Sequence, residues 1–423
     1  MTPNSRLRGG LHLPISTVLA LTITVAIAVA GGVFFAGWEL LGARSLKPER
    51  QLTASTLFDL VKLAAGVVAG VGALVALVVA YRRQLVDEAG ALREEKAALR
   101  DITRLHTERF TTAVSQLGDE SAAVRLGGVH ALAGLADDAP TPELRQTCID
   151  VLCAYVRLPY TAETDLPPNN TEARHAYLSL REVRHTVIRL IREHLLLADD
   201  RPHSWQGHNF DFTNAVFDGG DFSDVQFSGG RLSFRSARFE GGTVNFNDAE
   251  FGDGRVDFGG AVFSGCTVNF RGARFDGGRV NFRHAVFSGC TVNFRGARFD
   301  GGRVNFHRAA FEGGTVDFRG AELNGSDMSF FGAAFSDGTV TFGGAELSDG
   351  QFSFRRAEFE GGTVDFSDAD FSGARADFRH AVFSGGTVDL LRARGAAPDG
   401  LVPLNVDPLP TGLRLPPTWR RTS

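Results

Sequence analysis

The stretch AVFSGCTVNFRGARFDGGRVNF occupies residues 261–282 and occurs again, letter for letter, at residues 285–306. The second copy therefore begins 24 positions after the first (285 minus 261), and looser copies extend in both directions. Such repetition indicates structural units that bury a continuous core only when they stack. The composition agrees, because the 423 residues include 50 Gly and 35 Phe but only 4 Tyr and 2 Met.

The spacing of the apolar residues predicts very short strands. Phe, or Leu in its place, recurs in alternating steps of seven and five residues from Phe227 to Phe383, and Ala recurs every twelve residues from Ala237 to Ala393. Each 12-residue unit reads A-x-F-x-G-G-x-V-x-F-x-x. In both triplets the two apolar residues face one side of an extended chain, and the Gly, Asp, Ser and Arg between them are turn and surface types. The pattern therefore predicts a β-solenoid.

The repeats NFRGARFDG, DFSDVQFSG and DFTNAVFDG resemble those of pentapeptide-repeat proteins, and the resemblance covers residues 209–394. The whole layout also resembles membrane-anchored actinobacterial proteins of this family, which have two N-terminal spans and a helical segment before the repeats. The resemblance implies a right-handed, four-sided parallel β-helix. Its central Phe and the small residue two positions earlier point inward, whereas Asn281, Arg283, Val286 and Ser288 point outward. The implied inward core includes Phe246, Phe251, Phe258, Phe263, Phe270, Phe275, Phe282, Phe287, Phe294, Phe299, Phe306, Phe311, Ala273, Ala285, Ala297, Val280 and Val292.

This sequence departs from the family pattern in the length of its coil. Two extra residues, such as Gly278 and Arg279, follow every second pentapeptide, so a four-sided coil takes about 24 residues, the period of the exact duplication. The alternative is a flattened coil of about 12 residues, the shorter period in the sequence. In the longer coil Cys266 and Cys290 lie one strand spacing apart, within reach of a disulfide. In the flattened coil they are two layers apart. In a reducing cytoplasm we expect both thiols to be free.

The N-terminal residues predict a membrane anchor. After a tail of residues 1–13, two transmembrane helices are expected within residues 14–82. Residues 14–38 carry no charge and are long enough to span a bilayer, and residues 63–81 form a second uncharged run. The alternative for the first run is a cleaved signal peptide, which its length and the second run disfavour. Arg6, Arg8, Arg82 and Arg83 flank the pair. This favours a multi-pass protein of the bacterial plasma membrane, with both termini and the repeats in the cytoplasm.

Residues 83–200 predict a helical domain, and residues 395–423 form a Pro-rich tail that either covers the last coil or extends freely. Leu85, Leu92 and Leu99 recur every seven residues, which predicts a short coiled coil and a homo-oligomer. The alternative is a juxtamembrane helix that packs on its own chain. Cys148 and Cys153 are expected in the core, because no further ligand stands at metal-binding spacing.

No residue pattern predicts catalysis, a cofactor or a metal. His284, His307 and His380 are isolated from any nucleophile, and the Gly clusters lack the Lys and Ser/Thr of a phosphate-binding loop. The net charge of −5 gives no strong general attraction to nucleic acid. The central repeats do contain many basic residues, which we interpret as a basic binding face: Arg271, Arg274, Arg279, Arg283, Arg295, Arg298, Arg303 and Arg308.

These features favour a non-enzymatic, membrane-anchored scaffold that presents a rigid, repetitive surface. The expected partners are the lipid bilayer and another protein, and nucleic acid is disfavoured. One alternative is the DNA mimicry by which some pentapeptide-repeat proteins regulate topoisomerases. The acidic residues gather only in residues 346–370, so the rod lacks the continuous negative stripe that mimicry needs. The other alternative is a purely structural, oligomerising membrane protein.

Overall fold

The computed structural model describes residues 15–40, 54–252, 254–401 and 409–419. The chain divides into two compact units between Asp101 and Ile102. The first unit contains α1 (Ile15–Leu40) and most of α2 (Ala54–Leu117). Among the described residues, one helical stretch, Leu57–Leu117, is long and apolar enough to cross a membrane. A span in α1, the two-span topology and its cytoplasmic side remain predictions.

The predicted coiled coil lies within α2, which continues from its apolar part to Leu117 without a break. The side chains of Leu85 and Leu92 lie outside the described residues, and the Leu99 side chain is exposed. The homo-oligomer therefore stays a prediction.

The second unit begins with the end of α2 and a small helical domain. This domain contains α3 (Ala122–Asp137), α4 (Pro142–Arg157), the short helix η2 (Glu163–Asp165) and α5 (Thr171–Leu195). Thr141 begins α4, because its hydroxyl accepts a hydrogen bond from the Leu144 N–H, and Asn170 caps α5 in the same way through the Ala173 N–H. Gly128 permits close packing of α3 on α2, since a Cβ there would lie 2.7 Å from the backbone nitrogen of Leu117. Cys148 and Cys153 are buried in the core of this domain.

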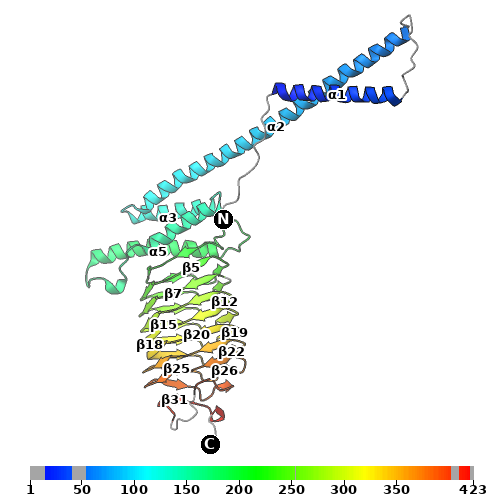
Figure 1. The fold of residues 1–423 in the computed structure, drawn as a ribbon. Helices are drawn as coiled ribbons and strands as arrows, with labels where there is room; N and C mark the ends of the chain where they lie inside the picture. Colours follow the sequence, from blue (N-terminus) through cyan, green and yellow to red (C-terminus); the bar gives the residue numbers. More distant parts are fainter. Residues whose placement is uncertain (1–14, 41–53, 253, 402–408, 420–423) are drawn as a thin grey trace. The chain divides into compact units, whose positions relative to one another are not determined.

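The repeats form three parallel sheets that wind around a common core (Figure 1). Sheet A contains β1 (Phe210–Asp211), β5 (Arg231–Ser233), β9 (Arg255–Asp257), β13 (Arg279–Asn281), β17 (Arg303–Asn305), β20 (Asp327–Ser329), β23 (Gln351–Ser353) and β27 (Arg375–Asp377). Sheet C contains β4 (Gln226–Phe227), β8 (Glu250–Phe251), β12 (Arg274–Asp276), β16 (Arg298–Asp300), β19 (Glu322–Asn324), β22 (Glu346–Ser348), β26 (Asp370–Phe371) and β30 (Arg394–Gly395).

Sheet B covers the remaining two sides of the coil. Its first run contains β2 (Val216–Phe217), β6 (Arg238–Glu240), β10 (Val262–Ser264), β14 (Val286–Ser288), β18 (Ala310–Asp317), β21 (Ala334–Thr341), β24 (Glu358–Phe359) and β28 (Val382–Phe383). Its second run contains β3 (Gly220–Asp221), β7 (Thr243–Asn245), β11 (Thr267–Asn269), β15 (Cys290–Asn293), β25 (Thr363–Asp365), β29 (Thr387–Asp389) and β31 (Leu413–Arg414). The strands β18 and β21 belong to both runs, because they pass through the corner without a break.

The register of the strands confirms the longer of the two predicted coils. Phe263 pairs with Phe287, and Val268 pairs with Val292, so each residue lies beside the residue 24 positions later. The flattened coil is excluded, because residues separated by half that distance lie on different sides, as Phe263 in β10 and Phe275 in β12 do. The fold is the predicted β-solenoid, a four-sided parallel β-helix that follows an all-helical region.

Stacked Phe rings fill the β-helix. The ring of Phe294 lies between those of Phe270 and Phe318, with centroids 4.8 and 4.7 Å away. These stacked pairs are nearly parallel, whereas neighbouring columns such as Phe282 and Phe294 meet edge to face. Every residue of the implied inward core is at most 3% exposed. The core is therefore a continuous set of ring columns that holds the coils in register.

The two coils approach closely at the corner between the two runs of sheet B, where Gly314 and Thr315 are the extra pair of residues. Gly314 has a φ of 77° and lies directly beside Cys290 of the preceding coil. A Cβ at Gly314 would lie 2.0 Å from the Cys290 carbonyl oxygen. Only glycine therefore permits the coils to stack at this corner.

Both ends of the β-helix are covered. At the first coil, α4 lies against β1 and α5 lies against β3 (Figure 1). At the other end, the Pro-rich tail adds β31 beside β29 and the short helix η3 (Pro417–Trp419). The Trp419 ring contacts Phe371 edge to face, and its N–H donates to the Gly395 carbonyl. These segments shield part of the strand edges at the two ends, where an uncovered edge could pair with another chain.

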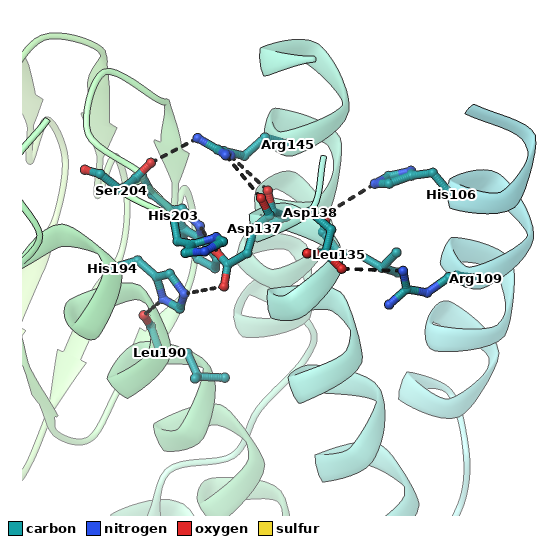
Figure 2. A network of polar contacts seen from close by, with 12 residues as sticks. His106, Arg109, Leu135, Asp137, Asp138, Arg145, Leu190, His194, His203 and Ser204 are labelled. Atoms are coloured by element: carbon teal, nitrogen blue, oxygen red, sulfur yellow. Dashed lines mark hydrogen bonds and ion pairs between the residues drawn. The ribbon is translucent and has the colours of Figure 1, made fainter. Parts of the chain in front are cut away.

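Asp137, at the end of α3, joins the helical domain to the segment that leads into the first coil (Figure 2). Its carboxylate accepts hydrogen bonds from the Trp205 indole and from His194 Nε2, each at 3.1 Å. The other ring nitrogen of His194 donates to the Leu190 carbonyl at 2.6 Å. Burial alone would lower the pKa of His194, but the hydrogen bonds to Asp137 and Leu190 raise it. The protonated imidazole satisfies both acceptors at once.

A second polar cluster lies where α5 meets the first coil. The Asp218 carboxylate, which follows β2, accepts hydrogen bonds of 2.6 Å from the hydroxyls of Tyr160 and Tyr177. His185 of α5 lies 3.5 Å from the same carboxylate. Arg184 donates to the carbonyls of Val156 and Val216 and lies over the Tyr160 ring, 4.1 Å from its centroid. The cluster connects α4, α5 and the first coil through buried groups.

The stacking of Cys266 and Cys290 predicts a specific crosslink. Both thiols are buried and free, and the Cys266 thiol donates a hydrogen bond to the Cys290 sulfur. That hydrogen bond and burial raise the pKa of Cys266, and the same hydrogen bond lowers the pKa of Cys290. The thiolate, which is the form that reacts, is therefore expected on Cys290, and its fraction rises with pH. We expect a mild oxidant to form a 266–290 disulfide more quickly at pH 9 than at pH 7, as measured by peptide mapping. A crosslink to Cys148 or Cys153 instead would contradict the stacking, and Cys290→Ser is the control.

Candidate functional site

The outer surface of sheet A, which we call the trough, carries three columns of side chains that run along the β-helix, and the hollow itself lies over strands β17 to β27. In each coil, the residue before the inward Val stands on one wall, the residue after it lies on the floor, and the residue after the next Phe stands on the other wall. In the coil of β13 these are Arg279, Asn281 and Arg283. In this coil the two walls carry long side chains and the floor carries a short one. Similar residues recur at these positions in neighbouring coils, because the sequence repeats with the period of the coil.

The trough is deepest over strands β17 to β27, where it encloses about 550 Å³. Its floor there is formed by Asn305, Ser329, Ser353 and Asp377. One wall is formed by Arg303, Asp327, Gln351 and Arg375, and the other by His307, Phe331, Arg355 and Arg379. The size is that of a ligand pocket, but the shape is open and elongated.

The carboxylates of the trough neutralise only some of its arginines. Arg303 pairs with Asp327 at 3.8 Å, and both Arg355 and Arg379 converge on Asp377, at 3.7 and 2.6 Å. The Arg379 hydrogen bond keeps the pKa of Asp377 below its usual range. By contrast, several exposed wall arginines have no carboxylate within ion-pair distance among the residues that the structure describes. These are Arg235, Arg255, Arg279, Arg283 and Arg375.

One wall also carries aromatic groups. The His307 imidazole lies 5.5 Å from the Phe331 ring, and its Nε2 is 3.0 Å from the Ser329 hydroxyl on the floor. The guanidinium of Arg356 lies over the other part of the Phe331 ring, at 5.7 Å. Burial and the charge of Arg283 lower the pKa of His307, which favours its neutral form at pH 7. The wall therefore offers an apolar ring and a neutral hydrogen-bonding group between charged residues.

The single basic face interpreted from the sequence is wrong. Only Arg279, Arg283 and Arg303 of that set line the trough. The others lie elsewhere: Arg274 and Arg298 on sheet C, Arg271 and Arg295 at the end of the second run of sheet B, and Arg308 in the turn after sheet A. The reason is geometric, since the chain turns a corner every few residues and successive arginines stand on different sides of the coil. Arginines share a face only when they occupy the same position in successive coils or lie on the same strand.

The arginines on sheet C are also neutralised, unlike several of those in the trough. Arg274 pairs with Glu250 at 2.9 Å, and Arg298 pairs with Glu322 at 3.0 Å, each across adjacent coils. Arg274 and Arg298 thus each have a carboxylate partner on an adjacent coil, which Arg279 lacks among the described residues.

Sequence reasoning missed several wall residues of the trough. They are Arg231, Arg235, Arg255, Arg355, Arg375 and Arg379. A signal was present for some of them, because Arg231, Arg255, Arg279 and Arg303 follow one another at the period of the coil. In the next two coils the same position is occupied by Asp327 and Gln351, so the run of arginines at the period of the coil ends at Arg303.

The comparisons with known proteins agree with this architecture. A stacked, four-sided β-helix with a Phe ring at the centre of each side defines a β-solenoid. The family model described as pentapeptide repeats, in 9 copies, matches residues 270–322, which lie in the middle of the β-helix. This part of the β-helix is thus similar to pentapeptide repeats. No curated protein matches the chain well enough to be called a relative.

Proposed function

We propose that this protein is a non-enzymatic scaffold, anchored in a membrane, whose β-helix binds another protein along its rigid repetitive surface. The apolar part of α2 supports the anchor. The trough on sheet A supports the binding role, and it is the observation that carries the proposal. Its wall arginines are held at fixed intervals by strands whose inner residues are fully packed.

A rigid surface suits binding because little conformational freedom is lost when a partner docks. The wall residues Arg303, Asp327, Gln351 and Arg375 lie in short strands that pair with the strands of adjacent coils, so the Phe columns beneath set their Cα positions. The exposed guanidinium groups can then form paired hydrogen bonds with carboxylates. A β-solenoid of this family is typically non-catalytic. The expectation that His307 is isolated was wrong, because its Nε2 lies 3.0 Å from the Ser329 hydroxyl.

Capture from a cell extract tests the scaffold. The full-length chain in detergent, fixed through its C-terminus, is expected to retain a specific protein. The variant Arg279→Glu with Arg303→Glu is expected to retain much less of it, because two adjacent coils then repel the partner. Retention of nothing by the unaltered chain would count against a scaffold.

Charge mimicry of DNA is less well supported. It requires a negative stripe, whereas the outer surface of sheet A is lined by arginines, and two carboxylates of sheet C, Glu250 and Glu322, are paired with Arg274 and Arg298. A topoisomerase that bound equally well to the unaltered chain and to the arginine variant would favour mimicry instead.

A further inference from the structure

We infer that the trough on sheet A binds an extended, acid-rich polypeptide segment, which lies along the axis of the β-helix. The inference rests on the proposed scaffold function and names the surface and the chemistry of the partner. It is carried by three observations: a column of uncompensated arginines, a narrow floor of amide and hydroxyl groups, and carboxylates placed between the arginines.

The first observation concerns the wall before the floor. Arg231, Arg255, Arg279 and Arg303 stand on successive coils of this wall. Adjacent parallel strands are about 4.8 Å apart, so the column presents guanidinium groups at short, regular intervals. Such crowding of like charges is unfavourable unless anions neutralise it. Among the described residues, Asp257 and Asp327 neutralise only Arg231 and Arg303, which leaves the middle of the column for an external anion.

The second observation concerns the floor. Asn281, Asn305, Ser329 and Ser353 form one column of short polar side chains between the walls. The two walls begin four residues apart on the chain, which separates their Cα atoms by at most about 13 Å. This width admits a single extended chain. Amide and hydroxyl groups both donate and accept hydrogen bonds, as do the N–H and C=O groups of a peptide backbone.

The third observation favours a polypeptide over a nucleic acid as the ligand of the trough. Asp327 on the wall and Asp377 on the floor lie within the deepest part of the trough. A nucleic acid strand carries a charge on every unit, so some of its phosphates would face these carboxylates. A polypeptide can place a neutral or basic residue opposite each one. Phe331, half-buried beside His307, gives an apolar residue of the same segment a place to pack.

A bilayer surface fits the trough less well. The floor residues Asn305 and Ser329 are half-buried behind the arginine walls, where a flat layer of headgroups does not reach them. Lipid binding would depend on the exposed guanidinium groups alone. A narrow chain contacts both the walls and the floor.

The test compares two matched pairs of arginines in the full-length chain, solubilised in neutral detergent. Arg279→Gln with Arg303→Gln removes two charges from adjacent coils of the trough. Arg274→Gln with Arg298→Gln removes two charges from adjacent coils of sheet C. The probe is a fluorescent poly-L-glutamate, and its anisotropy is measured at low salt. We expect the trough pair to weaken binding about tenfold and the sheet C pair to change it less than about twofold.

A competition experiment tests which class of ligand the trough prefers. Polyuridylate and vesicles that contain phosphatidylserine are added at equal charge concentration, and we expect poly-L-glutamate to be displaced least by the vesicles. Equal weakening by both arginine pairs, or tighter binding of polyuridylate than of poly-L-glutamate, would overturn the inference.

The two proposals fail in different ways. If poly-L-glutamate does not bind and the captured cell protein is still retained by Arg279→Glu with Arg303→Glu, the trough assignment is wrong and the scaffold stands. If the unaltered chain captures no protein at all, the scaffold itself is wrong, whatever the probe does.

Discussion

Replacement of Phe294 by alanine is expected to destabilise the β-helix by about 3–5 kcal/mol, the usual range for a buried Phe. The ring is fully buried and stacks on Phe270 and Phe318 in the neighbouring coils. It also meets the Phe282 ring edge to face. Its loss leaves a cavity that the hydrogen-bonded coils above and below cannot close, so little of the cost is recovered by collapse.

The matched control is Phe331→Ala. This Phe stands on the outer wall of the trough and is only half-buried, so we expect a loss below about 1 kcal/mol. Urea unfolding of the full-length chain in detergent, followed by tryptophan fluorescence, measures both. Trp205 is buried beside the first coil and Trp419 lies against the last, so they report on the two ends separately. Similar losses for the two variants would show that the Phe columns do not carry the stability of the rod.

The core of the β-helix was predictable because its signal is local and repeated. Alternation within each triplet determines which side of a strand is buried, and the period of Phe determines how strands follow one another. The family resemblance then implied four sides, and the position of the extra pair, such as Gly278 and Arg279, implied the length of the coil. All of these features depend on residues that lie within one coil, and each feature recurs in many repeats of the sequence.

The side of the β-helix on which each arginine lies was not predictable in the same way. Whether Arg274 and Arg279 share a side depends on the direction in which each corner turns, and this is a property of the whole coil. Whether an arginine is neutralised depends on the residue at the same position in the adjacent coil, as for Arg274 and Glu250. Counting charges along a continuous segment therefore combined arginines from several sides into one set.

The junction between the helical domain and the first coil gave no sequence signal. Asp218 has the same position in its repeat as Glu240 and Ser264, and nothing local distinguishes it. Its partners Tyr160 and Tyr177 lie 58 and 41 residues earlier in the chain. Contacts of this kind arise only once α4 and α5 are docked, and no period in the sequence reports them.

This junction gives the second prediction of large effect. Replacing Asp218 by asparagine is expected to destabilise the second unit by about 3 kcal/mol at pH 7, within the range for breaking a buried charged cluster. The amide accepts fewer hydrogen bonds than the carboxylate and carries no charge opposite His185 and Arg181. The control is Asp224→Asn. Its pairing with Arg192 is exposed, so we expect a loss below about 1 kcal/mol.

The pH dependence of stability distinguishes the charge of Asp218 from its shape. Burial alone would raise the pKa of Asp218, but the hydrogen bonds from His185, Tyr160 and Tyr177 lower it well below the value of about 3.9 for an unfolded aspartate. The carboxylate therefore stabilises the folded chain fully above about pH 4, and this contribution is lost as the pH falls through the folded-state pKa. Urea titrations between pH 7 and pH 2, followed through Trp205, are expected to show a steeper acid loss in the unaltered chain than in Asp218→Asn. Parallel curves would mean that the pKa of Asp218 is the same in the folded and the unfolded chain, because only a difference between these two pKa values makes the stability depend on the protonation of this group.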